Sequence, residues 1–562
     1  MRIRRLLLWT TPIALTATLG IALGCAVGEA RLDESAAHLA AGNAHAAAVA
    51  VLPLADKPIY GDAAREALRV ARAMAGQEPV AQANGPIDEE RFPIAVLTRN
   101  AFERGDFQAA LALDDLAHAT GQPTAPLVRA AALIEEGRVH ELPSEPWKTG
   151  GGELSQRVRQ YLDGVSEHAY RTIVRDRNGV FIGYLGADGV LELAPGVPEA
   201  VIPRNTARLV QQQSGAPSIR LSLDLELSLA AYETFGYYHG SIVLVDPKTG
   251  EILAAVSDPR SFKRASGTPA FEQQREPASI SKIITTTAFR RSGEDPDAEI
   301  SEMYCRGHGR YAGELLYCAY VARSLHGLDR ALALSCNFAF AELGVKAGRR
   351  HVVDELRRYG FDNQEWNFPA GRIVQAWGDD RQLADMSVGL EATEITPLHA
   401  AMVATVMAND GVMPRPTLLH AEDSRLGLHP RPVAHESGHR VIPPEWVPEM
   451  LQAMEAVVDR GTGRNLAPRN FPIAMKTGTA SHPRYAFHVN YIGIGPLPEA
   501  RVAFAVRITD QPTSRKVRYA AKRVTRRLLE RLGDISDQRG WNTEQRSPRF
   551  QRPTSSLSSV AP

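Results

Sequence analysis

The sequence lacks a surplus of either charge, because 64 Lys and Arg residues balance 64 Asp and Glu residues over 562 positions. A nucleic-acid-binding chain usually carries a basic excess, so this composition argues against nucleic acid as a partner. Lysine is also scarce, with nine residues against 55 arginines. Each lysine is therefore more informative than an arginine.

Cysteine is rare as well, and the four cysteines stand at positions 25, 305, 318 and 336. So few cysteines cannot form a dense disulfide framework, but they fit an exported protein with one or two bridges at most. Cys305 and Cys318 are thirteen positions apart, with three glycines between them. A loop-closing disulfide and a pair of reduced thiols are the two alternatives for this pair.

One long uncharged run, residues 6–27, follows three arginines at the N-terminus. About twenty residues cross ~30 Å of hydrocarbon as a helix, and basic residues before the span predict a cytoplasmic N-terminus. A cleaved signal peptide and a lipoprotein signal with lipidation of Cys25 are the alternatives. Residues 1–30 are thus predicted to attach the chain to a bacterial inner membrane, by a single span or a lipid, or to export it. In each case the remaining chain lies in the periplasm.

Residues 31–145 are rich in alanine and predict an all-α domain. The expected helices are separated by glycines at intervals of 34, 29 and 32 residues, at positions 42, 76, 105 and 137. This spacing is close to the period of helix-turn-helix repeats, and it resembles tetratricopeptide repeats. An irregular helical domain is the alternative. A repeat domain of this kind predicts a protein partner that binds through residues 31–145.

The rest of the chain divides by its pattern into three segments. Residues 146–215 begin with glycines and continue with alternating apolar and polar residues, which predicts a linker and a small β-rich connector. Residues 216–534 contain apolar strands and helices and form the main candidate domain. Residues 535–562 are polar and rich in serine and proline, which predicts a disordered tail.

The tripeptide Lys-Thr-Gly occurs three times, at residues 148–150, 248–250 and 476–478. The first copy lies in the predicted linker. The second copy joins two apolar segments, residues 242–245 and 252–256, in a sequence typical of a hairpin turn. The third copy lies on a predicted strand and follows two serine motifs. It is the copy that we expect in a functional site.

The first serine motif places Ser279 three residues before Lys282, at the start of a predicted helix. Residues at this spacing share a helix face, so the lysine amine can reach the serine hydroxyl. An ordinary lysine with a pKa of ~10.4 is protonated, but burial and a second cation would lower that pKa and leave a neutral base. The second motif, Ser335 and Asn337, is either part of the same site or a buried pair satisfied within its own helix.

In this order, Ser-x-x-Lys, Ser-x-Asn and Lys-Thr-Gly resemble the class B penicillin-binding proteins, members of the serine penicillin-recognising enzymes, whose three motifs line one cleft. The resemblance covers about residues 217–532. It implies an α+β fold in which helices flank an antiparallel sheet, and it implies a peptidoglycan D,D-transpeptidase that cross-links stem peptides and is inhibited by β-lactams. No stretch resembles the glycosyltransferase signature of class A members, so one activity is expected.

The resemblance also implies roles for individual residues. Ser279 is the nucleophile, and Lys282 takes its proton. The full catalytic set is Ser279, Lys282, Ser335, Asn337 and Lys476, and the substrate-binding set is Thr477, Gly478 and Thr479. The backbone N–H groups of Ser279 and Thr479 are expected to form an oxyanion hole. The acyl transfer requires no metal and no organic cofactor.

Three residues depart from the family pattern, and other functions remain as alternatives. Ala278 and Met475 stand where the family often has glycine, and Ser281 stands where a bulky residue is common. The alternatives are a noncatalytic β-lactam sensor or scaffold, a D,D-carboxypeptidase, and a zinc peptidase. The last rests on the His-Glu-x-x-His match at residues 435–439, which needs a continuous helix that Gly438 disfavours.

Overall fold

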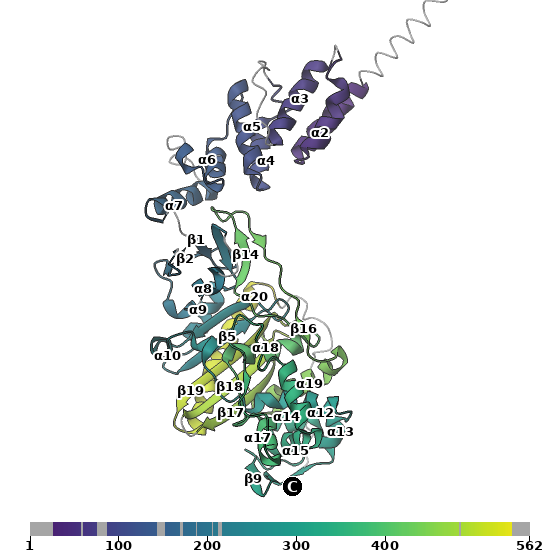
Figure 1. Ribbon diagram of the computed structural model, residues 1–562, viewed down its shortest axis with the longest axis vertical. Helices are drawn as coiled ribbons and strands as arrows, with labels where there is room; N and C mark the ends of the chain where they lie inside the picture. The colour runs from purple at the N-terminus through teal and green to yellow at the C-terminus, as the bar shows by residue number, and fades with distance from the viewer. Residues whose placement is uncertain are drawn as a thin grey trace, which may run out of the picture. The chain divides into compact units, whose positions relative to one another are not determined.

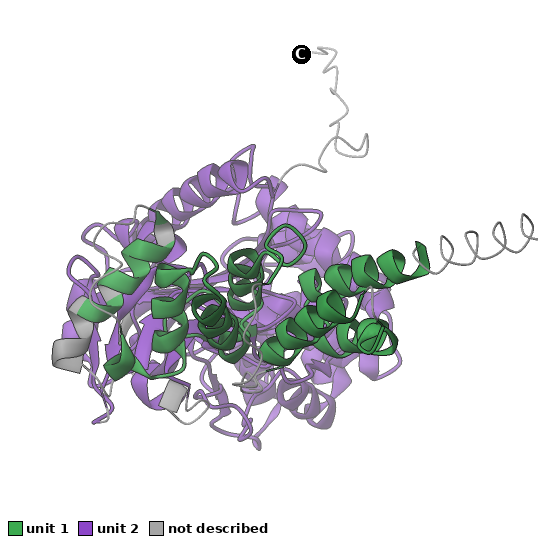
Figure 2. Cartoon of the chain, turned by 90° about the horizontal axis from the view of Figure 1, so that it is seen from above, with its two compact units in different colours: residues 1–171, 423–431 green, residues 172–422, 432–562 purple. Residues whose placement is uncertain are grey.

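The computed structural model describes residues 26–57, 60–75, 87–142, 152–168, 172–186, 188–204, 206–211, 216–482 and 485–541. The chain divides into two compact units, residues 1–171 with 423–431 and residues 172–422 with 432–562 (Figure 2). Cys25, most of the predicted membrane segment, the first Lys-Thr-Gly copy and the end of the predicted tail lie outside the described residues. Within the described ranges, no helix combines the length and the apolarity that a bilayer span requires.

Unit 1 is helical, as predicted for residues 31–145. After a helix at residues 26–40 follow α2 (Ala44–Val51), α3 (Gly61–Met74), α4 (Ile94–Glu103), α5 (Phe107–Thr120), α6 (Pro126–Glu135) and α7 (Glu153–His168) (Figure 1). Gly42, Gly105 and Gly137 each follow a helix with φ between 76° and 82°. This left-handed conformation ends a helix without strain at glycine, so the turns predicted at these three glycines are confirmed, while the fourth, Gly76, lies outside the described residues.

Unit 2 is built around a five-stranded antiparallel sheet in the order β17-β18-β19-β5-β6 (Figure 1). Its strands are β5 (Gly240–Val245), β6 (Ile252–Ser257), β17 (Ala474–His482), β18 (Tyr485–Gly495) and β19 (Val502–Gln511). The second Lys-Thr-Gly copy forms the turn between β5 and β6, where the Gly250 N–H donates to the Asp246 carbonyl over 2.9 Å. The predicted hairpin is confirmed.

Helices cover both faces of this sheet. Asn490 and Tyr491 are consecutive on β18, so their side chains point to opposite faces. Tyr491 lies near Arg518 of α20 (Ser514–Gln538). Asn490 bonds to Arg507 of β19, whose guanidinium donates to the carbonyl of Ile395, two residues before α18 (Pro397–Ala408). The sheet is therefore the middle layer between α18 and α20.

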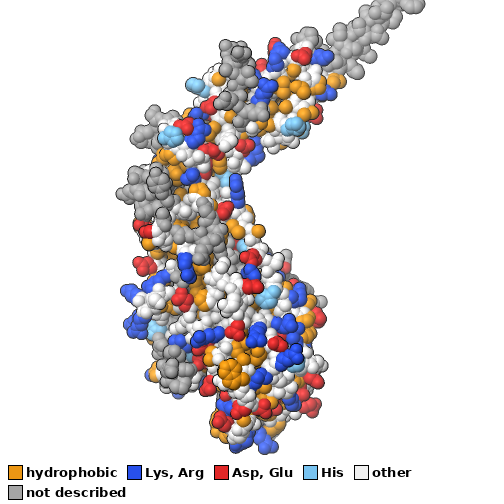
Figure 3. All heavy atoms as spheres, viewed as in Figure 1, with side chains coloured by type: hydrophobic (Ala, Val, Ile, Leu, Met, Phe, Trp, Pro, Cys, Tyr) orange, Lys and Arg blue, Asp and Glu red, His pale blue; other side chains and the backbone are white. Residues whose placement is uncertain are grey.

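The remaining helices of unit 2 surround the sheet and carry the first two motifs. In chain order they are α8 (Thr206–Gln211), α9 (Leu225–Glu233), α10 (Pro259–Arg264), α11 (Pro269–Glu272), the 3-10 turn η5 (Ala278–Ile280), α12 (Ser281–Arg291), α13 (Pro296–Ser301), α14 (Leu328–Leu334), α15 (Asn337–Ala347), α16 (Arg349–Arg358), α17 (Asp380–Val388) and α19 (Val447–Arg460). Short strands accompany them, including β7 (Tyr304–Cys305), β8 (His308–Tyr311), β9 (Glu314–Tyr317) and β16 (His439–Arg440). Figure 3 shows acidic and basic side chains interspersed over the visible face, in line with the zero net charge.

The domain boundary predicted at residue 216 does not coincide with a structural division. A second sheet has the order β15-β14-β4-β1-β2-β3, with β1 (Thr172–Arg175), β2 (Phe181–Leu185), β3 (Leu191–Leu193), β4 (Ser218–Leu221), β14 (Leu419–Asp423) and β15 (Arg431–Pro432). The antiparallel connector strands are present as expected, but β1 pairs with β4 across the predicted boundary. The backbone hydrogen bonds between β1 and β4 join residues on both sides of position 216 in one sheet. The connector and the segment after it therefore fold as one unit.

The C-terminal boundary also differs from the prediction. Helix α20 continues to Gln538, four residues beyond Asp534, where the ordered domain was expected to end. Ile535 and Ser536 are buried in this last turn. Burial of the Ile535 side chain extends the helix into the segment whose polar composition predicted disorder.

Candidate active site

Ser279 lies in the tight turn η5, directly before α12. The residue before it, Ala278, has φ of 55°, a left-handed conformation that costs a non-glycine residue roughly 1–2 kcal/mol. The turn is held because the Ala278 N–H donates to the Gly389 carbonyl over 2.8 Å. Glycine would adopt this conformation without strain, which explains physically why alanine here is a departure from the family pattern.

Lys282 extends from the first turn of α12 into a fully buried position. Its Nζ donates to the Ser335 carbonyl over 2.7 Å, to Ser335 Oγ over 3.1 Å and to Asn337 Oδ1 over 2.7 Å. None of these acceptors is Ser279 Oγ, so the amine is hydrogen-bonded to the second motif, Ser335 and Asn337, and not to the nearby Ser279. Burial lowers the pKa of Lys282 to about 8, and negative charge on Cys336 or Cys318 acts in the opposite direction.

Ser335 and Asn337 form the junction between α14 and α15. Ser335 ends α14 with φ of 54°, and this bend turns its hydroxyl and carbonyl toward Lys282. Asn337 begins α15, and its Nδ2 donates to the Tyr317 carbonyl over 2.8 Å. Their partners come from α12 and from the end of β9, so the alternative of a pair satisfied within its own helix is wrong.

Lys476 reaches the same hydroxyl from β17. Its buried Nζ donates to Ser335 Oγ over 2.9 Å and to the Thr477 carbonyl over 2.7 Å. Burial lowers the pKa of Lys476 well below its ordinary value, and the charge of Lys282 lowers it further. The structure thus brings the two amines together on one hydroxyl, Ser335 Oγ. Two adjacent buried ammonium groups repel each other, which favours loss of one proton.

The edge strand β17 lies against the turn that carries Ser279. A Cβ atom on Gly478 would stand 3.1 Å from both the Ser279 nitrogen and the Ala278 Cβ, closer than side-chain carbons ordinarily approach. Thr477 is hydrogen-bonded through its hydroxyl to Thr462, and Thr479 is partly exposed further along the strand. The third Lys-Thr-Gly copy is therefore the one that reaches the serine motifs.

A buried brace behind the turn was missed by the sequence analysis. Asn490 Nδ2 donates to the carbonyls of Glu276 and Pro277 over 2.9 and 3.3 Å. Arg507 is fully buried, and its Nε donates to Asn490 Oδ1 over 2.6 Å. Two central strands of the sheet thereby fix the backbone just before Ser279. The available signal was one polar residue in each of two otherwise apolar segments, Asn490 in residues 489–495 and Arg507 in residues 502–508.

The other two departures from the family pattern are also accommodated. Met475 is fully buried and lies opposite Gly493 on β18. Its sulfur is 2.9 Å from the place where Gly463 would carry a Cβ, so two glycines provide the space. Ser281 is buried too, and its Oγ has no hydrogen-bond partner among the described residues.

The histidine motif does not form a metal site. His439 begins β16, and its Nε2 donates to the Arg358 carbonyl over 2.7 Å. His435 Nε2 lies 3.5 Å from Glu251 Oε1 instead. The zinc-peptidase alternative is wrong, because the segment is not helical and the two imidazoles face separate partners.

Of the two alternatives for Cys305 and Cys318, the structure has the pair of free thiols and not the disulfide. Their sulfurs lie 3.7 Å apart, against about 2.05 Å in a disulfide. Cys336, which the sequence analysis did not pair, lies 3.8 Å from Cys318.

The model of the penicillin-binding protein transpeptidase domain matches residues 240–530. The match covers more than half of the chain and includes all three motifs. The fold agrees, since the sheet with its flanking helices is the α+β arrangement expected from the motifs. The chain belongs to the family of penicillin-binding protein transpeptidase domains.

Individual proteins show the same relationship. The chain is 28% identical over 315 residues to the peptidoglycan D,D-transpeptidase PbpA of Mycolicibacterium smegmatis. This alignment covers 49% of this chain and 62% of that protein. It is 24% identical over 424 residues to the peptidoglycan D,D-transpeptidase MrdA of Acinetobacter baumannii, 63% of this chain and 62% of that protein. The matched regions therefore span less than two thirds of these relatives.

Solved structures share the fold at low sequence identity. The D,D-transpeptidase domain of a peptidoglycan glycosyltransferase from Eggerthella lenta aligns with a TM-score of 0.55 and 22% identity, over 65% of this chain and 98% of that one. Penicillin-binding protein 3 of Mycobacterium tuberculosis aligns with a TM-score of 0.55 and 18% identity, over 66% and 96%.

Proposed function

We propose that this protein is a peptidoglycan D,D-transpeptidase that works through a serine acyl-enzyme. One observation carries the proposal: Lys282 and Lys476 both donate to Ser335 Oγ, while Gly478 lies so close to the turn of Ser279 that an added Cβ would stand 3.1 Å from the Ser279 nitrogen. This arrangement supplies a nucleophile, a base of lowered pKa and a proton path in one place. The membership in the transpeptidase family and the names of the relatives support it.

In the first step, Ser279 Oγ attacks the carbonyl carbon of the penultimate residue of a D-Ala-D-Ala peptide. Neutral Lys282 takes the hydroxyl proton. The bond to the terminal D-alanine then breaks, and the departing amine takes a proton back through Ser335. In the second step, an amine of a neighbouring stem peptide attacks the acyl-enzyme, and the oxygen of Ser279 regains its proton.

The surrounding groups stabilise charge during these steps. The N–H groups of Ser279 and Thr479 form the oxyanion hole, and loss of one such donor costs about a hundred- to a thousandfold in rate. Thr477 and Thr479 hold the terminal carboxylate, and Asn337 holds the substrate amide. A carboxylate near Lys476 favours the charged form of that amine. The positive charge on Lys476 then favours the neutral form of the neighbouring Lys282, which is the form that acts as a base.

The N-terminal sequence supports a placement of the enzyme at the inner membrane. Residues 1–30 attach the protein to the inner membrane, as a span or through a lipid on Cys25, with the catalytic unit in the periplasm. The helical hairpins of unit 1 resemble tetratricopeptide repeats in their glycine-ended turns, and they bind a protein partner. The stem peptides of peptidoglycan are the substrates, and β-lactams act as covalent inhibitors.

Covalent labelling with a fluorescent β-lactam tests the nucleophile. We expect one adduct on the purified protein, with mass spectrometry placing it on the peptide that contains Ser279. Ser279→Ala abolishes labelling, whereas Ser281→Ala, two residues away at a buried hydroxyl without a partner, retains it. Labelling that persists in Ser279→Ala places the nucleophile elsewhere and overturns the proposal.

A second assay separates transpeptidation from the related alternatives. The protein is incubated with a D-Ala-D-Ala stem peptide in the presence of an amine acceptor, and the products are separated by mass. A cross-linked product supports the transpeptidase, and release of D-alanine with hydrolysis alone indicates a carboxypeptidase. β-Lactam labelling without turnover of the peptide indicates a sensor.

A further inference from the structure

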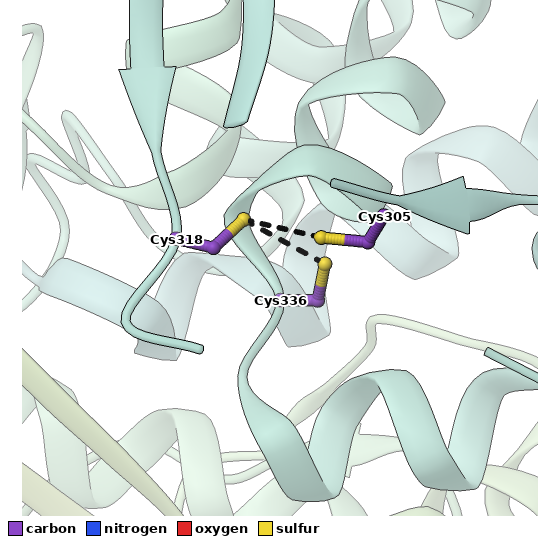
Figure 4. A group of neighbouring side chains, drawn as sticks. All are labelled: Cys305, Cys318 and Cys336. Carbon is purple, nitrogen blue, oxygen red and sulfur yellow. Dashed lines mark hydrogen bonds between the residues drawn. The ribbon is translucent and has the colours of Figure 1, made fainter. Parts of the chain in front are cut away.

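Three cysteine sulfurs converge next to the catalytic residues. Cys305 ends β7, Cys318 directly follows β9, and Cys336 lies between α14 and α15 (Figure 4). The sulfurs of Cys318 and Cys305 are 3.7 Å apart, and those of Cys318 and Cys336 are 3.8 Å apart. All three atoms lie within 4.8 Å of one another. Three segments that are separate in the sequence thus direct their thiols to one point.

The distances match those around a thiolate-bound metal ion. Zinc–sulfur bonds of about 2.3 Å with tetrahedral angles place neighbouring sulfurs about 3.8 Å apart. A disulfide has a sulfur–sulfur bond of about 2.05 Å and joins only two sulfurs. A disulfide within this cluster would therefore leave the third thiol unbonded. The separations of 3.7 and 3.8 Å, which hydrogen bonds between the thiols span in the structure, match two edges of a coordination tetrahedron, and the third pair of sulfurs lies within 4.8 Å.

The backbone around the cluster supports negatively charged sulfur. The Gly307 N–H donates to the sulfur of Cys305 over 3.4 Å, and the Phe338 N–H donates to the sulfur of Cys318 over 3.3 Å. Donors around the ligands of a metal ion orient them and adjust their electron density. Cys305 and Cys336 are buried, while Cys318 is partly exposed, which gives an ion an approach from one side.

We propose that Cys305, Cys318 and Cys336 bind one thiophilic d10 metal ion, Zn²⁺ or Cu⁺, as thiolates. Binding releases the thiol protons to solvent as the metal–sulfur bonds form, and no electron is transferred. Zn²⁺ completes its tetrahedron with a water molecule, and Cu⁺ is satisfied by three sulfurs. This ion is structural, so the acyl transfer itself still needs no metal.

The position of the cluster gives the ion a function in the active site. Cys336 stands between Ser335 and Asn337, the two residues that accept hydrogen bonds from Lys282. The side chain of Asn337 also bonds to the carbonyl of Tyr317, the neighbour of Cys318. An ion that joins Cys318 to Cys336 therefore fixes the two segments that position the partners of Lys282.

Metal titration of the full-length protein tests the site. The reduced, metal-free protein is dialysed against Zn²⁺, or against Cu⁺ under anaerobic conditions, and bound metal is measured by mass spectrometry. We expect one equivalent, with an affinity at least a hundredfold lower in Cys318→Ser. That residue is the most exposed of the three, so its replacement disturbs folding least. Cys25→Ser is the matched control and binds as the wild type does.

Two further readouts distinguish a metal site from other states of the thiols. Co²⁺ bound in place of Zn²⁺ gives thiolate-to-metal charge-transfer absorption, which we expect to weaken in Cys318→Ser. A cooperative urea unfolding transition of that variant shows that its fold is retained. The proposal is overturned by less than stoichiometric binding, by binding unchanged in Cys318→Ser, or by peptide mapping that finds a disulfide among the three cysteines in the protein as isolated. These results concern the thiols alone and leave the acyl-enzyme proposal intact.

Discussion

Replacement of Gly478 by alanine tests the close approach of β17 to the nucleophile turn. The added methyl carbon would stand 3.1 Å from the Ser279 nitrogen, 3.1 Å from the Ala278 Cβ and 3.2 Å from the Pro277 carbonyl oxygen. Ordinary contacts begin near 3.4 Å, so the strand and the turn must separate by a few tenths of an ångström. The turn is held by Gly389 and Asn490, and therefore the edge strand is the part that moves.

The expected cost of Gly478→Ala is larger for catalysis than for stability. Overpacking of one methyl group destabilises a fold by about 1–3 kcal/mol. A shift between Ser279 and β17 misplaces one of the two proposed oxyanion donors, and loss of such a donor lowers the rate by about a hundred- to a thousandfold. The measurement is the second-order rate constant for acylation by a chromogenic β-lactam, together with the free energy of unfolding in urea.

Gly293→Ala is the matched control for this experiment. Gly293 follows α12 with φ of 97° and has no atom within 4 Å of its would-be Cβ. Alanine there costs roughly 1–2 kcal/mol through the backbone conformation alone, without touching β17. We expect its acylation rate to stay within twofold of the wild type. If folded Gly478→Ala acylates as fast as Gly293→Ala, the proposed contact between strand and nucleophile has no catalytic role.

Three other predictions concern the base, the brace and unit 1. Because neutral Lys282 is the proposed base and its pKa is about 8, the acylation rate should rise about tenfold between pH 7 and pH 9; a flat profile contradicts this role. Asn490→Ala leaves the buried Arg507 Nε unpaired, which should lower the free energy of unfolding by about 1–3 kcal/mol and slow acylation at least tenfold. Tyr491→Phe, on the opposite face of the sheet, should leave acylation unchanged. Equal acylation rates in the two variants would refute the role of Asn490 and Arg507 behind the turn. Deletion of residues 31–145 should leave acylation within twofold but abolish partner binding or localisation, and loss of acylation would show that unit 1 supports the site directly.

The order and spacing of the three motifs predicted the site more completely than any single motif. Ser279 and Lys282 are local in sequence, so helical spacing alone predicted that they share one face, although the amine of Lys282 is bonded to Ser335 and Asn337 in the structure. Lys476 is 141 residues beyond Ser335, and only the family resemblance connected the two. The structure adds the shared hydroxyl of Ser335, which no pattern of residue types specifies, because it depends on the left-handed bend that joins α14 to α15.

Other features were inaccessible for physical reasons. Asn490 and Arg507 are ordinary polar residues in their own strands, and their importance follows only from the register that places them side by side. The boundary at residue 216 was wrong because strand pairing is non-local, and composition does not reveal that β1 pairs with β4. The convergence of three cysteines depends on the packing of three segments, whereas spacing along the chain suggested only a pair.

The sheet order has a consequence for when the protein becomes reactive. Strand β17 attaches to β5 only through β18 and β19, and both of these strands follow it in the sequence. During synthesis, Ser279 emerges more than two hundred residues before β19 is complete. A nascent chain therefore carries Ser279 long before Lys476 can reach Ser335 from β17, and the site stays incomplete until nearly the last strand of the sheet has been made.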